Sequence, residues 1–117
     1  MDGFMLLLHD STTSMGDISP EEIQGIIAEY VAWRDKIEEQ GRLVGGEKLT
    51  DEGGRHLTNE NGEIRVTDGP YAEAKEMLGG YFAIKAADYD EAVEISRSCP
   101  HLKYGGRIEV RKIDNHR

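Results

Sequence analysis

The 117-residue sequence contains a single cysteine, Cys99, so no disulfide can form within the chain, and nothing favours an oxidising compartment. No apolar run approaches the roughly 18 residues that a membrane-spanning helix requires. The N-terminus also lacks the organisation of a secretory signal, because acidic Asp2 precedes a short apolar run, Phe4 to Leu8, with no small-residue cleavage site after it. We therefore expect a cytoplasmic protein that is not attached to a membrane.

Basic residues are scarce relative to acidic ones. The chain has 14 lysines and arginines against 23 aspartates and glutamates, for a formal net charge of -9. Phosphate backbones repel so acidic a protein, which argues against nucleic acid as a partner. The hydrophobic content of 38% is enough for one core in one compact domain over residues 1–117.

Glycine is abundant, but its spacing matches no nucleotide-binding motif. The segments "GGEKLT" and "DEGGRH" lack the glycine pattern of either phosphate-binding fingerprint, so we predict no cofactor. The histidines show no pair at helical or zinc-finger spacing, and a single cysteine leaves too few ligands for a structural zinc site; they are His9, His56, His101 and His116. We therefore predict no metal.

The first half of the chain reads as strand, helix, strand. Met5 to Leu8 is continuously apolar, which indicates a strand buried on both faces, although so short a run could also begin a buried helix. Ser19 and the proline after it predict a capped helix over Pro20 to about Gln40. The apolar residues of one face recur at three- and four-residue steps: Ile23, Ile26, Ile27, Tyr30, Trp33 and Ile37. The next strand, "RLVGGEKL", contains Gly45 and Gly46, a pair that suggests a bulge or a close backbone approach.

The second half repeats this order after an insertion. The segments "RHLTN" and "EIRVT" predict a hairpin that turns at Glu60, Asn61 and Gly62, and neither arm is apolar enough to be central. The segment "GGYFAIKA" predicts another strand. A helix capped near Asp88 then continues until Pro100 stops it, and "GGRIEVRKI" predicts the last strand.

Two βαβ units of this length predict an α+β fold: a ferredoxin-like βαββαβ sandwich with a β-hairpin insertion. In this fold a four-stranded antiparallel sheet carries both helices on one face. The other face needs a cover for its apolar residues, and a second copy of the chain can supply it. We therefore predict a homodimer that packs sheet on sheet.

Candidate catalytic residues follow from position. His9 and Asp10 stand where the first strand ends, a common place for working residues, although both could be ordinary strand-end polar groups. Tyr30 lies on the core side of the first helix, where it serves either as packing with a bonded hydroxyl or as a general acid. Either Asp10 or Asp68, which lies in the turn "DGP", could orient Tyr30 and His9.

Four further residues are candidates for binding a small-molecule ligand: Trp33, Glu47, Tyr71 and Glu73. For Trp33 the alternatives are a core position or a dimer contact. Composition by itself predicts only that the stretch from Thr67 to Tyr81 is a structured loop, since a turn and a glycine pair have sufficient backbone reasons to be there.

The segment "VTDGPYAEAKEMLGGYF" resembles the most characteristic stretch of the DGPF branch of the YCII-related superfamily, with Tyr71 in place of the usual phenylalanine. "FMLLLH", "SPEE", "GRLVGGEKL" and "GRIEVRKI" match in the same order, so the resemblance covers nearly the whole chain. It implies a ferredoxin-like fold that forms a dimeric α/β barrel.

The resemblance implies less about activity. Some members of the superfamily carry a helix histidine and an aspartate as a proposed catalytic pair, and one branch dehydrochlorinates a chlorinated hydroxyquinol. The position of that histidine corresponds to Tyr30 here, so the pair is not intact. DGPF-type proteins also resemble partners encoded beside extracytoplasmic-function sigma factors.

Two functions therefore remain open. The first is a small-molecule enzyme with a pocket between the sheet and the first helix, where Tyr30 and His9 act as acid and base. The second is a dimer without catalysis that binds a metabolite or serves an accessory, regulatory role.

Overall fold

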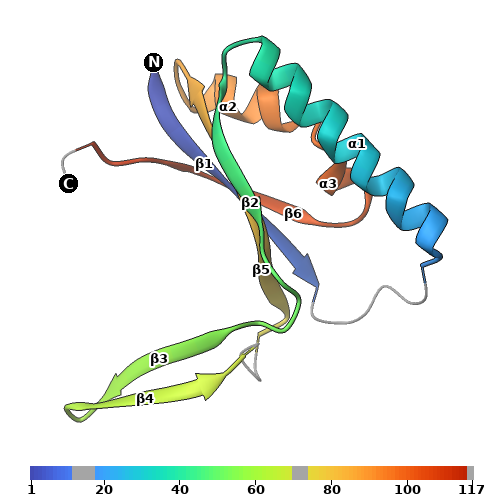
Figure 1. Ribbon diagram of the computed structural model, residues 1–117. Coiled ribbons are helices and arrows are strands. Elements are labelled where there is room, and N and C mark those ends of the chain that lie inside the picture. The colour runs from blue at the N-terminus through green and yellow to red at the C-terminus, as the bar shows by residue number, and fades with distance from the viewer. Residues whose placement is uncertain (12–17, 70–73, 116–117) are drawn as a thin grey trace.

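The computed structural model describes residues 1–11, 18–69 and 74–115 (Figure 1). The elements along the chain are β1 (Asp2–Ser11), α1 (Pro20–Glu39), β2 (Leu43–Lys48), β3 (Arg55–Glu60), β4 (Glu63–Asp68), β5 (Glu76–Ala86), α2 (Tyr89–Ser96), α3 (Pro100–Lys103) and β6 (Arg107–Lys112).

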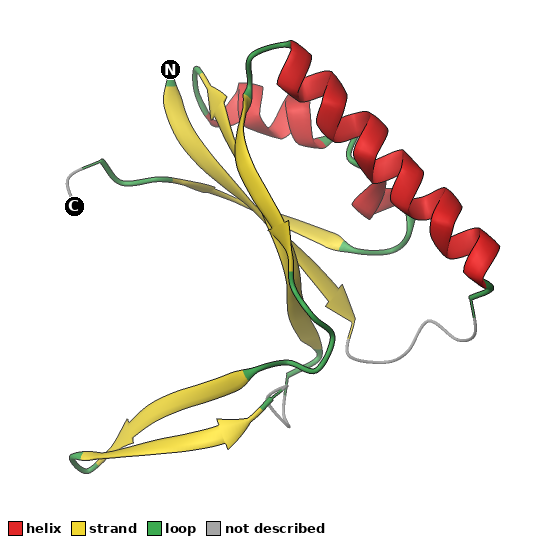
Figure 2. Ribbon diagram, viewed as in Figure 1, coloured by secondary structure: helices red, strands yellow, loops and turns green. Residues whose placement is uncertain are grey.

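Four strands form one antiparallel sheet in the order β2-β5-β1-β6. Both long helices lie against the same face of this sheet, and we call the other one the helix-free face (Figure 2). The predicted ferredoxin-like α+β fold is thereby confirmed, and the element order matches two βαβ units with a hairpin between them. None of the helices that the structure describes is long and apolar enough to cross a membrane.

Side chains of β1 alternate between the two faces of the sheet, and those on the helix-covered face form the centre of the core. Phe4, Leu6 and Leu8 point toward the helices and are buried, while Met5 and Leu7 lie between them on the helix-free face. The rest of the core comes from β5 and the helices, with Trp33, Ile37, Phe82, Ile84, Ala86, Ala92 and Cys99. The strand prediction for Met5 to Leu8 is therefore right, and the alternative of a buried helix is wrong.

Helix α1 begins as the sequence predicts, since the Ser19 hydroxyl accepts a hydrogen bond from the Glu22 amide at 3.2 Å. Its predicted apolar face is only partly correct. Trp33 and Ile37 are buried, but Ile23 and Ile27 are exposed because the N-terminal turns of α1 extend past the sheet (Figure 1). Periodicity marks an apolar face, but it does not show how far the supporting sheet reaches.

The prediction that Pro100 only stops a helix is wrong. Helix α2 already ends at Ser96, and Pro100 instead occupies the first position of the short helix α3, where a missing amide proton costs nothing. Helix α3 brings His101 into the interior.

Both glycine pairs in the sheet mark close backbone approaches. A Cβ on Gly46 would lie 2.8 Å from the Phe82 ring, and one on Gly80 would lie 2.9 Å from the Glu47 carbonyl oxygen. The register of β2 against β5 shifts between Leu43 and Gly45, so the predicted bulge is confirmed.

Strands β3 and β4 form a separate two-stranded sheet, as the sequence predicts. Leu57 pairs with Val66 and Asn59 with Ile64. In Figure 1 this hairpin extends below the four-stranded sheet, toward the side opposite α1 and α2.

Candidate functional site

Three polar side chains converge at the helix-covered end of β1. Tyr30, on α1, lies with its hydroxyl 3.0 Å from Nδ1 of His101, on α3. Nε2 of the same ring lies 3.8 Å from Oδ1 of Asp10, on β1. Residues 10, 30 and 101 come from three elements that are far apart in the sequence, and we call them the Tyr30 cluster.

The hydrogen bonds fix the state of the imidazole. Nε2 of His101 lies 2.9 Å from the backbone carbonyl oxygen of His9. Because a carbonyl oxygen can only accept, Nε2 donates this bond, and in the neutral ring Nδ1 is left as an acceptor. The Tyr30 hydroxyl then donates a hydrogen bond to Nδ1. A chain of two directed hydrogen bonds therefore runs from Tyr30 to the β1 backbone.

The surroundings keep Tyr30 protonated. Burial of the half-buried hydroxyl raises the pKa of Tyr30 well above its ordinary value, and the thiol of Cys99 and the carboxylate of Asp10 add to this effect. His101 is itself only 5% exposed, whereas Asp10 is partly exposed at the edge of the cluster. Water can thus reach Asp10 more easily than the imidazole.

Two glycines make room for this cluster. A Cβ on Gly79 would overlap the carboxylate of Asp10, and a Cβ on Gly106 would overlap the ring of His101. Gly79 is also the residue left unpaired where the register of β1 against β5 shifts between Leu8 and His9. The first glycine of "LGGY", Gly79, is therefore required because the Asp10 carboxylate occupies the space of its missing side chain.

A second polar group borders the cluster. The carboxylate of Glu29 accepts hydrogen bonds from Lys103 at 2.8 Å and from the hydroxyl of Tyr104 at 2.6 Å. Lys103 first and Tyr104 second lower the pKa of Glu29, which stays ionised. These contacts tie α1 to α3 and so hold Tyr30 opposite His101.

A groove near the base of the hairpin is lined by none of the three cluster residues, but it includes a neighbour of Asp10. Met77 is the cross-strand partner of Asp10 and lines this groove of about 430 Å³ together with Leu49 and Leu78. Its walls are mainly apolar, and His56 and Glu76 add polar groups. Among the described residues, no group of three or more histidines, cysteines, aspartates or glutamates could hold a metal ion.

The pairing of Tyr30 with His9 that the sequence suggests is wrong. The side chain of His9 lies on the helix-free face, where Nε2 is 3.0 Å from Oε1 of Glu109. Arg111 and then His9 lower the pKa of Glu109 through hydrogen bonds. Only the backbone carbonyl of His9 belongs to the Tyr30 cluster, because neighbouring residues of a strand point to opposite faces.

Asp68 does not approach Tyr30 or His9 either. It lies at the end of β4, exposed, where it pairs with Arg55 of the same hairpin. Its expected role of orienting a catalytic acid is therefore wrong, and Asp10 is the aspartate that lies beside the cluster.

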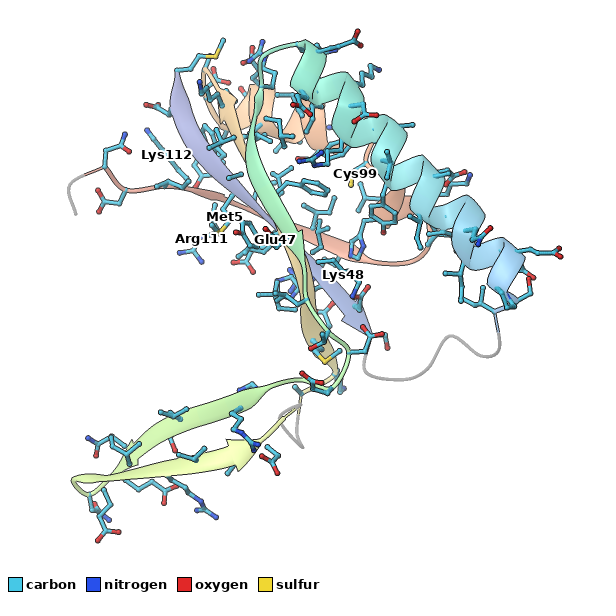
Figure 3. The ribbon with its side chains drawn as sticks, in the orientation of Figure 1. Met5, Glu47, Lys48, Cys99, Arg111 and Lys112 are labelled. Carbon is cyan, nitrogen blue, oxygen red and sulfur yellow. The ribbon has the colours of Figure 1, made fainter. Side chains whose placement is uncertain are left out.

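The four ligand-binding candidates do not gather at one place. Trp33 is 5% exposed, packs against Phe82 and donates a hydrogen bond to Ser98 at 3.0 Å, so it belongs mainly to the core. Glu47 lies opposite Tyr81 on β5 and is exposed, on the side away from Cys99 (Figure 3). Tyr71 and Glu73 lie outside the described residues.

Sequence reasoning missed His101. Spacing does not mark His101, because it has no histidine neighbour at helical or zinc-finger spacing. The signal that could have identified it is the segment after the second helix, where "PHLKYGG" combines a helix-starting proline with glycines that leave room for a ring. Its contact with Tyr30, 71 positions away, depends on tertiary structure.

Gly79→Ala should lower the free energy of unfolding by about 1 to 3 kcal/mol, because the new methyl group displaces the Asp10 carboxylate. Gly25→Ala on α1 is the control, since a Cβ there meets nothing within 4 Å and the residue lies away from the helix-free face. Urea unfolding of both variants makes the comparison. Equal losses of stability would contradict the overlap.

The titration of Tyr30 gives a pH-dependent prediction. Its raised pKa means that the unfolded chain loses this proton at a lower pH than the folded chain, so stability falls as the pH rises through the ordinary tyrosine value near 10. Tyr30→Phe should remove that part of the fall, as measured by urea unfolding from about pH 9 to about pH 11. In folded protein, Tyr30→Phe should leave the absorbance rise at 295 nm unchanged near pH 10. Loss of one tyrosine's amplitude there would refute the raised pKa.

Comparisons with known proteins agree with the fold. Over 112 residues, the chain is 30% identical to an uncharacterised protein of Rhizobium meliloti, covering 94% of this chain and 90% of that protein. Among solved structures it is similar to the 5-chloro-2-hydroxyhydroquinone dehydrochlorinase of Burkholderia phenoliruptrix, in complex with 2,5-dihydroxybenzoquinone. The TM-score is 0.51 at 17% identity, over 96% of this chain and 93% of that one.

A match to a protein-family model agrees with both of these similarities. The model of the YCII-related domain matches residues 3–115, which is nearly the whole chain. The resemblance found in "VTDGPYAEAKEMLGGYF" and the strand segments is thereby confirmed at the level of the superfamily. The chain belongs to the YCII-related domain family.

Proposed function

We propose that this protein is an enzyme that moves protons to and from a small molecule at the Tyr30 cluster. The observation that carries the proposal is the directed contact of Tyr30 with His101 at 3.0 Å, with Asp10 on the far side of the ring. General acid–base catalysis without a covalent intermediate requires such a hydrogen-bonded pair within reach of the substrate.

The proton path balances without any further reactant. As a substrate proton reaches the Tyr30 hydroxyl oxygen, the original hydroxyl proton passes to Nδ1 of His101. The resulting imidazolium keeps its Nε2 proton on the His9 carbonyl and is stabilised by the Asp10 carboxylate 3.8 Å away. The reverse transfer protonates a leaving group or an intermediate and restores the neutral pair.

In this proposal, His101 compensates for the absence of the superfamily's helix histidine. By the resemblance, Tyr30 corresponds to that helix position, and His101 of α3 lies beside it with its imidazole. A base is therefore retained, although it comes from a different element. Among the described residues, Asp10 is the aspartate that completes the pair.

We propose a small hydroxylated ring as the substrate. The apolar groove lined by Met77 suits a ring, and the structurally similar dehydrochlorinase of Burkholderia phenoliruptrix is in complex with 2,5-dihydroxybenzoquinone. Loss of hydrogen chloride from a chlorinated hydroquinone removes one proton and one chloride and needs no electron donor. Proton transfer by Tyr30 and His101 is sufficient for such a step.

Tyr30→Phe and His101→Gln should each lower the rate of chloride release from 5-chloro-2-hydroxyhydroquinone by about 100-fold or more, because each breaks the proton path. Tyr89→Phe is the control, since it removes a tyrosine hydroxyl outside the cluster, which accepts a hydrogen bond from the Lys112 amide. A chloride electrode follows turnover. Fluorescence of the chain's one tryptophan follows binding of 2,5-dihydroxybenzoquinone.

Two outcomes would contradict these proposals. Wild-type rates in Tyr30→Phe would remove the catalytic role of the cluster. Saturable binding of the quinone without turnover of the hydroquinone would favour the alternative function, a metabolite-binding dimer without catalysis.

We also propose a homodimer of the DGPF branch in the cytoplasm, with the helix-free faces packed on each other. The centre of that face is apolar, with Met5, Leu7, Tyr81 and Ala83. Acidic and basic side chains on it are equal in number, namely Glu47, Glu76, Glu109, Lys85, Arg107 and Arg111. A face without net charge in a chain of net charge -9 suits contact with a second copy.

Leu7→Arg should raise the dimer dissociation constant by about 100-fold, because a twofold interface buries the new charge twice. Leu102→Arg on α3 is the control, since that side chain is exposed on the helix-covered side. Light scattering over a dilution series measures both. A monomeric wild-type protein at micromolar concentration would refute the homodimer.

A further inference from the structure

The hairpin of β3 and β4 has one apolar face that is uncovered in the described chain. Because Leu57 pairs with Val66 and Asn59 with Ile64, these side chains share a face, while Thr58 and Arg65 lie on the other. Leu57 is 65% exposed, Ile64 61% and Val66 54%. Three branched side chains in a row on one small surface are unusual for a face that remains in water.

Such a hairpin needs a support. A two-stranded sheet is marginally stable in water by itself. Apart from their mutual pairing, β3 and β4 make no extensive contact with another described helix or strand. At their base, the Gly69 amide donates to the Gly54 carbonyl at 2.8 Å, which joins the two ends of the hairpin. Among the described residues, no helix or strand supplies this support.

Charge favours a second copy over a different partner. The helix-free face has no net formal charge. The hairpin has a formal charge close to zero, because two arginines nearly balance three acidic residues: Arg55, Arg65, Glu60, Glu63 and Asp68. The net charge of -9 therefore lies almost entirely on other surfaces. A basic partner would bind those acidic surfaces, whereas a second acidic chain meets least repulsion at the hairpin and the helix-free face.

Size supports the same occupant. A stable interface takes about 20 to 30 residues from each partner, and the helix-free face supplies roughly a dozen strand positions. β3 and β4 add six residues each. They also lie on the correct side, because the hairpin extends toward the side on which Met5 and Arg111 project (Figure 3). The hairpin and the helix-free face therefore both lie away from α1 and α2.

We infer that the β3–β4 hairpin is a dimerisation arm, whose face of Leu57, Ile64 and Val66 packs against a second copy of this chain. The arm extends the proposed sheet-on-sheet contact, and the inference rests on that proposed homodimer. It is independent of the Tyr30 cluster, so chloride release and arm contact can fail separately.

Leu57→Asp tests the arm, with Thr58→Asp as the matched control on the opposite face of the same strand. Sedimentation velocity over a dilution series should show the dimer dissociation constant raised about tenfold or more by Leu57→Asp, the loss expected of a contributing interface residue. Thr58→Asp should change it by less than about twofold, as an exposed residue outside the contact does. Equal changes in the two variants would overturn the arm.

Hydrogen exchange of the wild-type protein keeps the test open if Leu57→Asp fails to fold. Amides of residues 55–68 that face the partner should be protected in the dimer and lose that protection on dilution, together with those of the helix-free face. A dimer in which only the sheet residues change protection on dilution would overturn the arm and leave the sheet-on-sheet dimer intact. A monomer at every concentration would overturn both.

Discussion

The alternation of side chains along β1 is the constraint on which the rest of the structure depends. Every second residue of this central strand enters the core under α1 and α2, so Phe4, Leu6 and Leu8 anchor both helices. The same alternation continues past the apolar run and sends His9 and Asp10 to opposite faces. Asp10 thereby joins Tyr30 and His101 under the helices, while His9 joins Glu109 on the helix-free face. One geometrical rule thus sets both the core and the composition of the candidate site.

Close packing of backbones explains the glycines that make this chain recognisable. Gly80 lets β2 approach β5, Gly79 leaves space for the Asp10 carboxylate, and Gly106 leaves space for the His101 ring. The stretch around "LGGY" contributes no described side chain to the Tyr30 cluster. Instead, Gly79 has no side chain there, so the Asp10 carboxylate can lie at the sheet surface. A motif can therefore serve a site without containing its reactive groups.

The distribution of charge separates two sides of the molecule. The acidic excess lies away from the helix-free face, where glutamates are matched by Lys85, Arg107 and Arg111. Near the cluster, the ionised Glu29 is held by Lys103 and Tyr104, so this carboxylate fixes α3 against α1 and leaves Asp10 as the carboxylate nearest to His101. The proposed chemistry and the proposed self-association thus involve opposite faces of one sheet, so that a change in one need not disturb the other.

Local periodicity, caps, turns and motif order are enough to predict the element order, the α+β class, the separate hairpin and the superfamily. The sequence also identified Tyr30 and Asp10 as candidates. The position of His101 beside Tyr30, where the sequence suggested His9 or Asp68, is a property of the folded chain. That contact joins residues 71 positions apart, and no local pattern encodes it. The extent of the sheet likewise decided that Ile23 and Ile27 stay exposed on α1, since a helical pattern shows which residues share a face but not what lies opposite that face.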